Sequence, residues 1–171
     1  MAMESLQDLF VDELKDIYNA EKQIVRALPR MAKSASDPEL RKAFEHHLKQ
    51  TEGHVARLER IFKSIDSSPR GKTCKGMQGV IEEGKDIMQE GDRGSVMDAA
   101  LIAAAQRVEH YEIAAYGALR TYAELLGQDD AAKLLQQTLT EEEQTDQLLN
   151  QLAEGGINQA AVGAEEFEEE E

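Results

Sequence analysis

Four long stretches of this sequence repeat apolar residues at alternating steps of three and four, the spacing that places side chains on one face of a helix. The stretches cover residues 6–33, 38–64, 96–126 and 129–153. Strong helix formers such as Ala, Leu, Glu, Lys and Gln dominate the composition, and strand-favouring β-branched residues are few. We therefore predict an all-α protein built on four long helices.

The connections between these helices differ in length. Asp37 followed by Pro38 predicts a tight first turn with a capped helix start, and Gly127 predicts a tight last turn. The middle connection, residues 66–95, is long and contains a predicted short helix at residues 77–89. One long crossover between two tight turns is the connectivity of ferritin-like bundles. We predict a ferritin-like antiparallel four-helix bundle with a short extra helix in the crossover between the second and third long helices.

The formal net charge of −15 limits the partners of the chain. Such an acidic surface repels phosphate backbones and anionic lipids, so we expect neither nucleic acid nor a membrane as a partner. The longest apolar run, residues 99–105, is too short to span a bilayer. The polar N-terminus predicts no secretion signal, and the single cysteine, Cys74, allows no internal disulfide. These features predict a cytoplasmic protein.

The length of 171 residues fits one domain. Gly155 and Gly156 are predicted to end the fourth long helix, so we place the bundle domain at residues 1–156. The remaining residues, 157–171, form an acidic tail with six glutamates in its last seven positions. Because like charges repel one another, we expect this tail to be disordered.

Polar residues interrupt the apolar face of every long helix near its middle. In chain order, the interruptions are Glu21; His47, Thr51 and His54; Glu109 and Glu112; and Glu142 and Asp146. Counted from the tight turns at about 1.5 Å of rise per residue, their centres lie roughly 20–27 Å along the helices. We therefore expect these side chains to meet in one layer across the bundle.

Several carboxylates in an apolar layer are unfavourable, because each unpaired buried charge destabilises the fold. No arginine lies on the four faces, and the nearest, Arg107, is off the line. Divalent cations would neutralise the carboxylates, and oxygen ligands with one or two imidazoles suit Fe, Mn or Zn. Helical bundles hold di-iron and di-manganese sites with glutamates and Glu-x-x-His motifs. The sequence therefore predicts a dinuclear Fe or Mn site, with Zn as an alternative ion.

Glu21 and Glu112 are the first candidate ligands, followed by Glu109. On the second helix the candidates are His54 and His47. They lie seven residues apart, about 10.5 Å along the axis, so we do not expect them to bind the same ion. His54 is preferred, with His47 as a ligand or a hydrogen-bonded core residue.

On the fourth long helix two ligand pairs remain open. Glu142 and Asp146 follow the apolar face, whereas Glu143 and Asp146 have the i, i+3 spacing of ligands on one helix. We expect one of the two adjacent glutamates to face the core and the other to face solvent. The sequence alone does not decide which.

Several segments are distinctive: residues 18–23, 99–106 and 108–113 (Val-Glu-His-Tyr-Glu-Ile), and Glu142-Glu143 with Thr145-Asp146. Together they resemble the YciE/YciF family of ferritin-like stress proteins, over about residues 6–153. The resemblance implies a ferritin-like bundle, a homodimer and a link to stress, but no established reaction. The second helix lacks a Glu-x-x-His motif, which departs from the usual di-iron pattern.

Two adjacent metal ions can bind O₂ or peroxide between them. The leading hypothesis is a dimetal stress protein acting on peroxide, O₂ or ferrous iron; as an enzyme it would be an oxidoreductase of the di-iron or di-manganese carboxylate type. No catalytic residue can be named. The alternative is a non-catalytic structural or interaction bundle, a homodimer with a vestigial metal site, and the missing Glu-x-x-His motif favours it.

Overall fold

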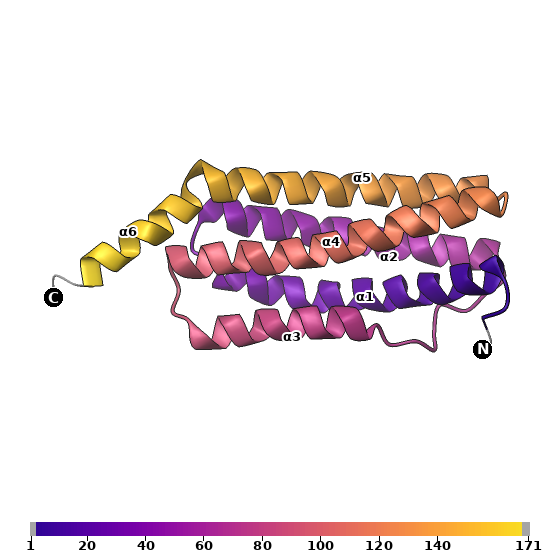
Figure 1. The fold of residues 1–171 in the computed structure, drawn as a ribbon, viewed down its shortest axis with the longest axis horizontal. Coiled ribbons are helices and arrows are strands. Elements are labelled where there is room, and N and C mark those ends of the chain that lie inside the picture. Colours follow the sequence, from indigo (N-terminus) through magenta and orange to yellow (C-terminus); the bar gives the residue numbers. More distant parts are fainter. Residues whose placement is uncertain (1–2, 169–171) are drawn as a thin grey trace.

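A computed structural model describes residues 3–168 of the chain, and the side chains of residues 3–164. Every regular element in that part is helical (Figure 1). The bundle consists of α1 (Leu6–Ser34), α2 (Pro38–Ser64), α4 (Ser95–Leu125) and α5 (Asp129–Leu152). Helix α1 packs against α2 and α4, and α5 packs against the same two helices. This confirms the predicted four-helix bundle and places each long helix within two residues of its predicted bounds.

The crossover between α2 and α4 carries the predicted extra helix, α3 (Lys75–Glu90). Figure 1 shows α3 lying outside the bundle, alongside α1 and α4, and it contacts both of these helices. Its N-terminus is capped by Cys74, whose sulfur accepts a hydrogen bond from the Met77 backbone. The crossover therefore covers one face of the bundle instead of looping through solvent.

Side-chain caps fix the start of the bundle helices. Asp37 accepts hydrogen bonds from the backbone nitrogens of Glu39 and Leu40, both at 2.9 Å. The buried Asp98 of α4 accepts from the backbone nitrogens of Ser36 and Asp37, at 2.7 and 2.9 Å. These bonds satisfy backbone donors that a helix start leaves open, and they tie the α1–α2 turn to α4.

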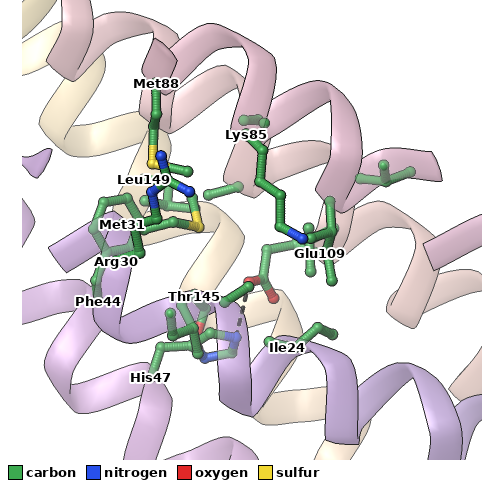
Figure 2. A pocket seen from close by; sticks show the side chains of 18 of the residues that line it. Ile24, Arg30, Met31, Phe44, His47, Lys85, Met88, Glu109, Thr145 and Leu149 are labelled. Atoms are coloured by element: carbon green, nitrogen blue, oxygen red, sulfur yellow. Dashed lines mark hydrogen bonds and ion pairs between the residues drawn. The ribbon is translucent and has the colours of Figure 1, made fainter. Parts of the chain in front are cut away.

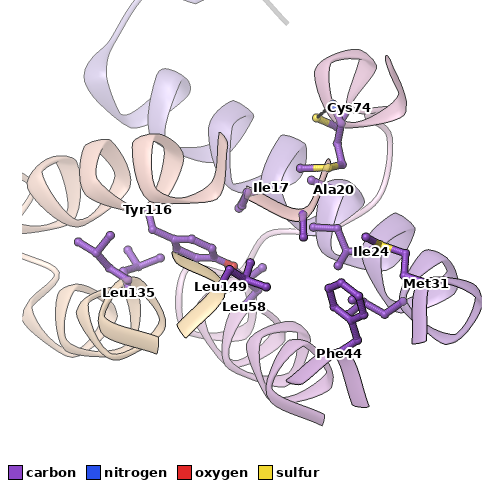
Figure 3. Packing of buried hydrophobic residues seen from close by; sticks show 14 of the residues in the cluster. Ile17, Ala20, Ile24, Met31, Phe44, Leu58, Cys74, Tyr116, Leu135 and Leu149 are labelled. Carbon is purple, nitrogen blue, oxygen red and sulfur yellow. Dashed lines mark hydrogen bonds between the residues drawn. The ribbon is translucent and has the colours of Figure 1, made fainter. Parts of the chain in front are cut away.

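The apolar faces of the helices form one continuous core. Figure 3 shows Ile17 and Ile24 of α1 facing Leu58 and Phe44 of α2, with Tyr116 of α4 close by. Each of these side chains is at most 2% exposed. Burial of a large apolar side chain stabilises the fold by about 1.5–3 kcal/mol, so these faces hold the four helices in register.

The C-terminal segment differs from the prediction of a disordered tail after residue 156. A wide turn at Ala153–Ile157, with Gly156 at a φ of 151°, leads into helix α6 (Asn158–Glu168). Ile157 is buried, and the Ser95 hydroxyl donates to the Ala160 carbonyl at 3.0 Å. These contacts with α4 order the start of the segment, and residues 169–171 lie outside the described residues.

No helix in the described part of the chain is both long enough and apolar enough to cross a membrane.

Candidate metal centre

Six of the predicted ligands meet in the middle of the bundle. Each long helix contributes at least one of them, and the regular helical register brings them to one level. They are Glu21 of α1, His47 and His54 of α2, Glu109 and Glu112 of α4, and Glu142 of α5, none more than 3% exposed. The predicted polar layer is therefore present as a buried cluster of four carboxyl groups and two imidazoles.

The six side chains form two overlapping groups of four. The His54 group contains Glu21, His54, Glu112 and Glu142, and the His47 group contains His47, Glu109, Glu112 and Glu142. In each group, one ligand atom per residue lies within 4.8 Å of all the others. Glu112 and Glu142 belong to both groups. Each group thus has its own histidine and its own glutamate, and the two share a pair of carboxylates.

Most donor atoms at the centre make no well-aligned hydrogen bond. Of the ten buried side-chain atoms without a partner in the described part of the chain, eight belong to this cluster. They include both oxygens of Glu112, both oxygens of Glu142, Nε2 of His47 and Nδ1 of His54. A buried polar atom left unsatisfied costs about 1–3 kcal/mol. The residues therefore fit a pair of cations, which would satisfy these atoms together.

Distances place both imidazoles against carboxylates. His54 Nδ1 lies 2.8 Å from Glu142 Oε1 and 3.2 Å from Glu21 Oε1. His47 Nε2 lies 2.9 Å from Glu109 Oε1 and 3.8 Å from Glu142 Oε2. The two ring centroids are 6.3 Å apart, and the rings fall in different groups, as their sequence spacing predicts.

In the metal-free cluster, the pKa values of the carboxyl groups are shifted in different directions. Burial, and then the charge of Glu142, raises the pKa values of Glu109 and Glu112 well above the usual range. Burial also disfavours ionisation of Glu142, but contacts with Glu109 and His54 lower the pKa of Glu142 to about 2. Burial lowers the pKa of His54, and its contacts with Glu142 and Glu21 outweigh that effect and raise it to about 10. Protons therefore neutralise the cluster where a metal would otherwise do so.

A hydrogen-bonded pair behind His54 was not predicted. His54 Nε2 donates to Glu141 Oε2 at 2.8 Å, and Arg57 binds both oxygens of Glu141, each at 2.8 Å. The carboxylate thereby fixes the ring orientation and leaves Nδ1 facing the cluster, as partners of metal-bound histidines commonly do. Arg57 and Glu141 were missed because they flank the apolar faces. The i, i+3 spacing of His54 and Arg57 is a signal that could have found the arginine.

The other ligand candidates have looser or single contacts. His47 Nδ1 lies 3.4 Å from Gln50 Oε1 and 3.3 Å from Thr145 Oγ1, so its ring is held less firmly than that of His54. The Tyr116 hydroxyl donates to Glu21 Oε1 at 2.5 Å, which orients the Glu21 carboxylate. The two groups are therefore supported unequally.

Two predicted site residues lie outside the cluster. Glu143 is exposed on the outer side of α5, because a residue adjacent to Glu142 is rotated by about 100° around the helix. Asp146 lies at the margin, where its Oδ1 is 3.3 Å from Nε2 of the exposed His110. The structure thus selects Glu142 as the inward residue and does not bring the Glu143–Asp146 pair into the core. Glu52 of α2 is also exposed and takes no part in the cluster.

Comparison with known proteins gives consistent matches over nearly the whole chain. The family model described as "Domain of unknown function (DUF892)" matches residues 5–162. The chain is 45% identical to Protein YciF of Escherichia coli (strain K12) over 162 residues, which are 94% of this chain and 98% of YciF.

Solved structures agree with this match. The crystal structure of the E. coli stress protein YciF has a TM-score of 0.88 at 44% identity, covering 91% of this chain and 99% of that one. YcfI from Rhodopseudomonas palustris has a TM-score of 0.83 at 40% identity, with 86% and 94% covered. A protein from Xanthomonas campestris, with a TM-score of 0.75 at 21% identity and 95% and 99% covered, shares the fold. The ferritin-like bundle predicted from the sequence is confirmed.

Proposed function

The chain belongs to the YciF family, whose domain is described as DUF892, and from this premise we propose that it is a stress-response protein with a dinuclear metal centre. The observation that carries the proposal is the set of eight donor atoms without a well-aligned hydrogen bond that converge from six buried side chains. Four glutamates and two histidines are also the donor set of di-iron and di-manganese bundles, although their positions along the helices differ here. Fe or Mn suits these ligands best, with Zn as the alternative.

In this proposal each group holds one ion. Glu21 and His54 would bind the first ion, His47 and Glu109 the second, and Glu112 and Glu142 would bind both. Bound Fe or Mn would supply redox chemistry towards peroxide, O₂ or ferrous iron. The chain itself orients His54 through Glu141, orients Glu21 through Tyr116, and surrounds the cluster with buried apolar side chains.

The direct test is the metal stoichiometry of the full chain. We expect about two equivalents of Fe²⁺ or Mn²⁺ to bind, measured by calorimetric titration under anaerobic conditions and by elemental analysis after desalting. The double variant Glu21→Ala/Glu112→Ala should bind neither ion with comparable affinity. If the wild-type chain takes up no Fe²⁺, Mn²⁺ or Zn²⁺, the metal proposal fails. The alternative of a structural bundle with a vestigial site would then account for the protein.

The pair behind His54 yields a second prediction. Replacing Arg57 by alanine should lower the affinity of the His54 group for metal about 10–100-fold, because the partner that fixes the Glu141 carboxylate is lost. Titration calorimetry should show one weakened site and one unchanged site. Arg60→Ala is the matched control, since Arg60 is an exposed arginine on the same helix. Equal losses in both variants would contradict a specific role for Arg57.

The homodimer and the cytoplasmic location expected from the sequence stay predictions. Sedimentation equilibrium of the full chain would test the first, and cell fractionation the second.

A further inference from the structure

A cavity joins the surface of the protein to one side of the metal cluster. It has a volume of about 90 Å³ and lies between α3 and the bundle, with walls from all five major helices. Apolar side chains form most of the wall, among them Ile24, Leu28, Phe44, Val80, Ile81 and Val108. Its inner end is formed by His47 and Glu109, which Figure 2 shows together at one end of the pocket. The cavity therefore reaches the His47 group.

The exposed charged side chains that line this cavity are all basic. They are Arg26 and Arg30 of α1 and Lys85 of α3. In Figure 2, Lys85 points toward the Glu109 end, whereas Arg30 lies near Met31 and Met88. None of the three makes an ion pair with a side chain of the described residues. On a chain with a net charge of −15, three cations lining one cavity are a local excess of positive charge.

The size of the cavity limits what it can hold. One water molecule needs about 10–15 Å³ of cavity volume, so a cavity of about 90 Å³ has room for roughly six to nine groups of that size. An apolar wall gives bound water few hydrogen bonds, and alkyl groups fit it better. A chain of about six carbon atoms would fill the space between the two arginines and the inner end.

We propose that the cavity binds a short-chain aliphatic carboxylate, with its carboxylate at Arg26 and Arg30, which lie one turn apart on α1, and its alkyl chain along the apolar wall. The far end of the alkyl chain then lies beside His47 and Glu109. The ligand would lie beside the proposed metal centre, so its role there rests on the proposed function.

Charge complementarity favours this ligand over others. A hydrated metal cation would be repelled by the two arginines and would gain nothing from an apolar wall. A neutral alkane-like molecule would use the wall and leave the two arginines without partners. A carboxylate with a short alkyl chain uses both features together.

The first test is binding of hexanoate to the metal-free full chain, measured by calorimetry with hexanol as the neutral control. We expect hexanoate to bind at least threefold more tightly than hexanol, and the difference to shrink at high salt, because exposed ion pairs are screened. Arg26→Gln/Arg30→Gln should weaken hexanoate binding about three- to tenfold. Lys75→Gln, at an exposed lysine of helix α3, should change nothing. Equal binding of the two ligands, or no binding of hexanoate, overturns the proposal.

A second variant fills the cavity itself. Gly84 lines it, and a Cβ built there meets only the Cβ of Ala104, at 3.7 Å, so a larger side chain can enter from this position. Gly84→Leu should lower hexanoate affinity more than tenfold. Gly79→Leu, on the same helix and with nothing within 4 Å of its Cβ, should bind hexanoate like the wild type. Unchanged binding in folded Gly84→Leu would place the ligand elsewhere and overturn the proposal.

The orientation of the ligand is tested on the Mn²⁺-loaded protein. Paramagnetic Mn²⁺ should broaden the proton signal of the terminal methyl group of hexanoate more than that of the methylene next to the carboxylate. Zn²⁺-loaded protein, which is diamagnetic, is the control. The reverse order of broadening overturns the proposed orientation. Because the calorimetry uses metal-free protein, a failure to load metal refutes the proposed function alone, whereas loaded protein that does not bind hexanoate refutes the ligand alone.

Discussion

Replacing Glu142 by glutamine should abolish tight binding of both metal ions, whereas the same change at Glu143 should leave both in place. Glu142 is fully buried and belongs to both groups of donors, while its neighbour Glu143 is exposed. Removing a residue that hydrogen-bonds to a metal ligand lowers metal affinity about 10–100-fold. Removing a carboxylate shared by both ions should therefore lower the affinity for each ion more than about 100-fold. Calorimetric titration with Mn²⁺ measures the two affinities directly.

Variants confined to one group provide the internal control. In the proposed arrangement, His54→Ala would remove a ligand of the first ion only, and His47→Ala would remove a ligand of the second only. Each should retain about one equivalent of metal after desalting. If Glu142→Gln instead behaves like a single-group variant, or if Glu143→Gln loses metal to the same extent, the shared-carboxylate arrangement is wrong.

Metal binding should also raise the thermal stability of the protein strongly. A ligand that binds only the folded state at a thousandfold excess over its dissociation constant adds about 4.1 kcal/mol to the free energy of unfolding. For a chain of this length, each 1 kcal/mol shifts Tm by about 2–4 °C, so one filled group should raise Tm by about 8–16 °C. Differential scanning calorimetry with Mn²⁺, and then with excess EDTA, should show the rise and its reversal.

The size of this shift should grow as pH rises. The folded metal-free protein has raised pKa values at Glu109 and Glu112, so the stability that their protons contribute is fully present at low pH and is lost as pH rises. The pKa of His54, raised to about 10, acts in the same direction above its usual value of 6.5. A bound metal would replace these protons and requires deprotonated ligands, so its binding should be favoured as pH rises.

The shift in Tm should therefore be small near pH 5 and large near pH 8. Glu112→Gln should lose most of the metal-dependent shift, because its neutral amide cannot replace the carboxylate. It should also make the metal-free protein less sensitive to pH. A shift that is constant across this pH range would mean that metal does not displace protons from the cluster.

Most of the centre was predictable from the sequence, because the helical repeat is regular. An apolar face that is broken at the same distance from each turn predicts that Glu21, His54, Glu112 and their neighbours share one level. That reasoning could not separate Glu142 from Glu143, because both are glutamates and the face of α5 carries further polar residues. The two residues point about 100° apart around the helix axis. Which of them faces the core depends on how α5 packs against α2 and α4.

The remaining features depend on contacts between distant parts of the chain. The Arg57–Glu141 pair joins α2 to α5 at the edge of the bundle, where a polar residue looks like an ordinary surface position. The cavity depends on how α3 lies over α1 and α4, which its sequence does not specify. The start of the C-terminal segment is held by contacts of Ile157 and Ala160 with the bundle, whereas the charge run alone predicted disorder.

The six donors are divided equally between two hairpins. The first hairpin, α1 and α2, carries Glu21, His47 and His54, and the second, α4 and α5, carries Glu109, Glu112 and Glu142. Neither half can assemble either group alone, since both groups draw on both halves. Closing the long crossover to bring the two halves together costs chain entropy. A metal ion that bridges the halves during folding would offset that cost, so the same ions would direct assembly of the tertiary structure as well as its chemistry.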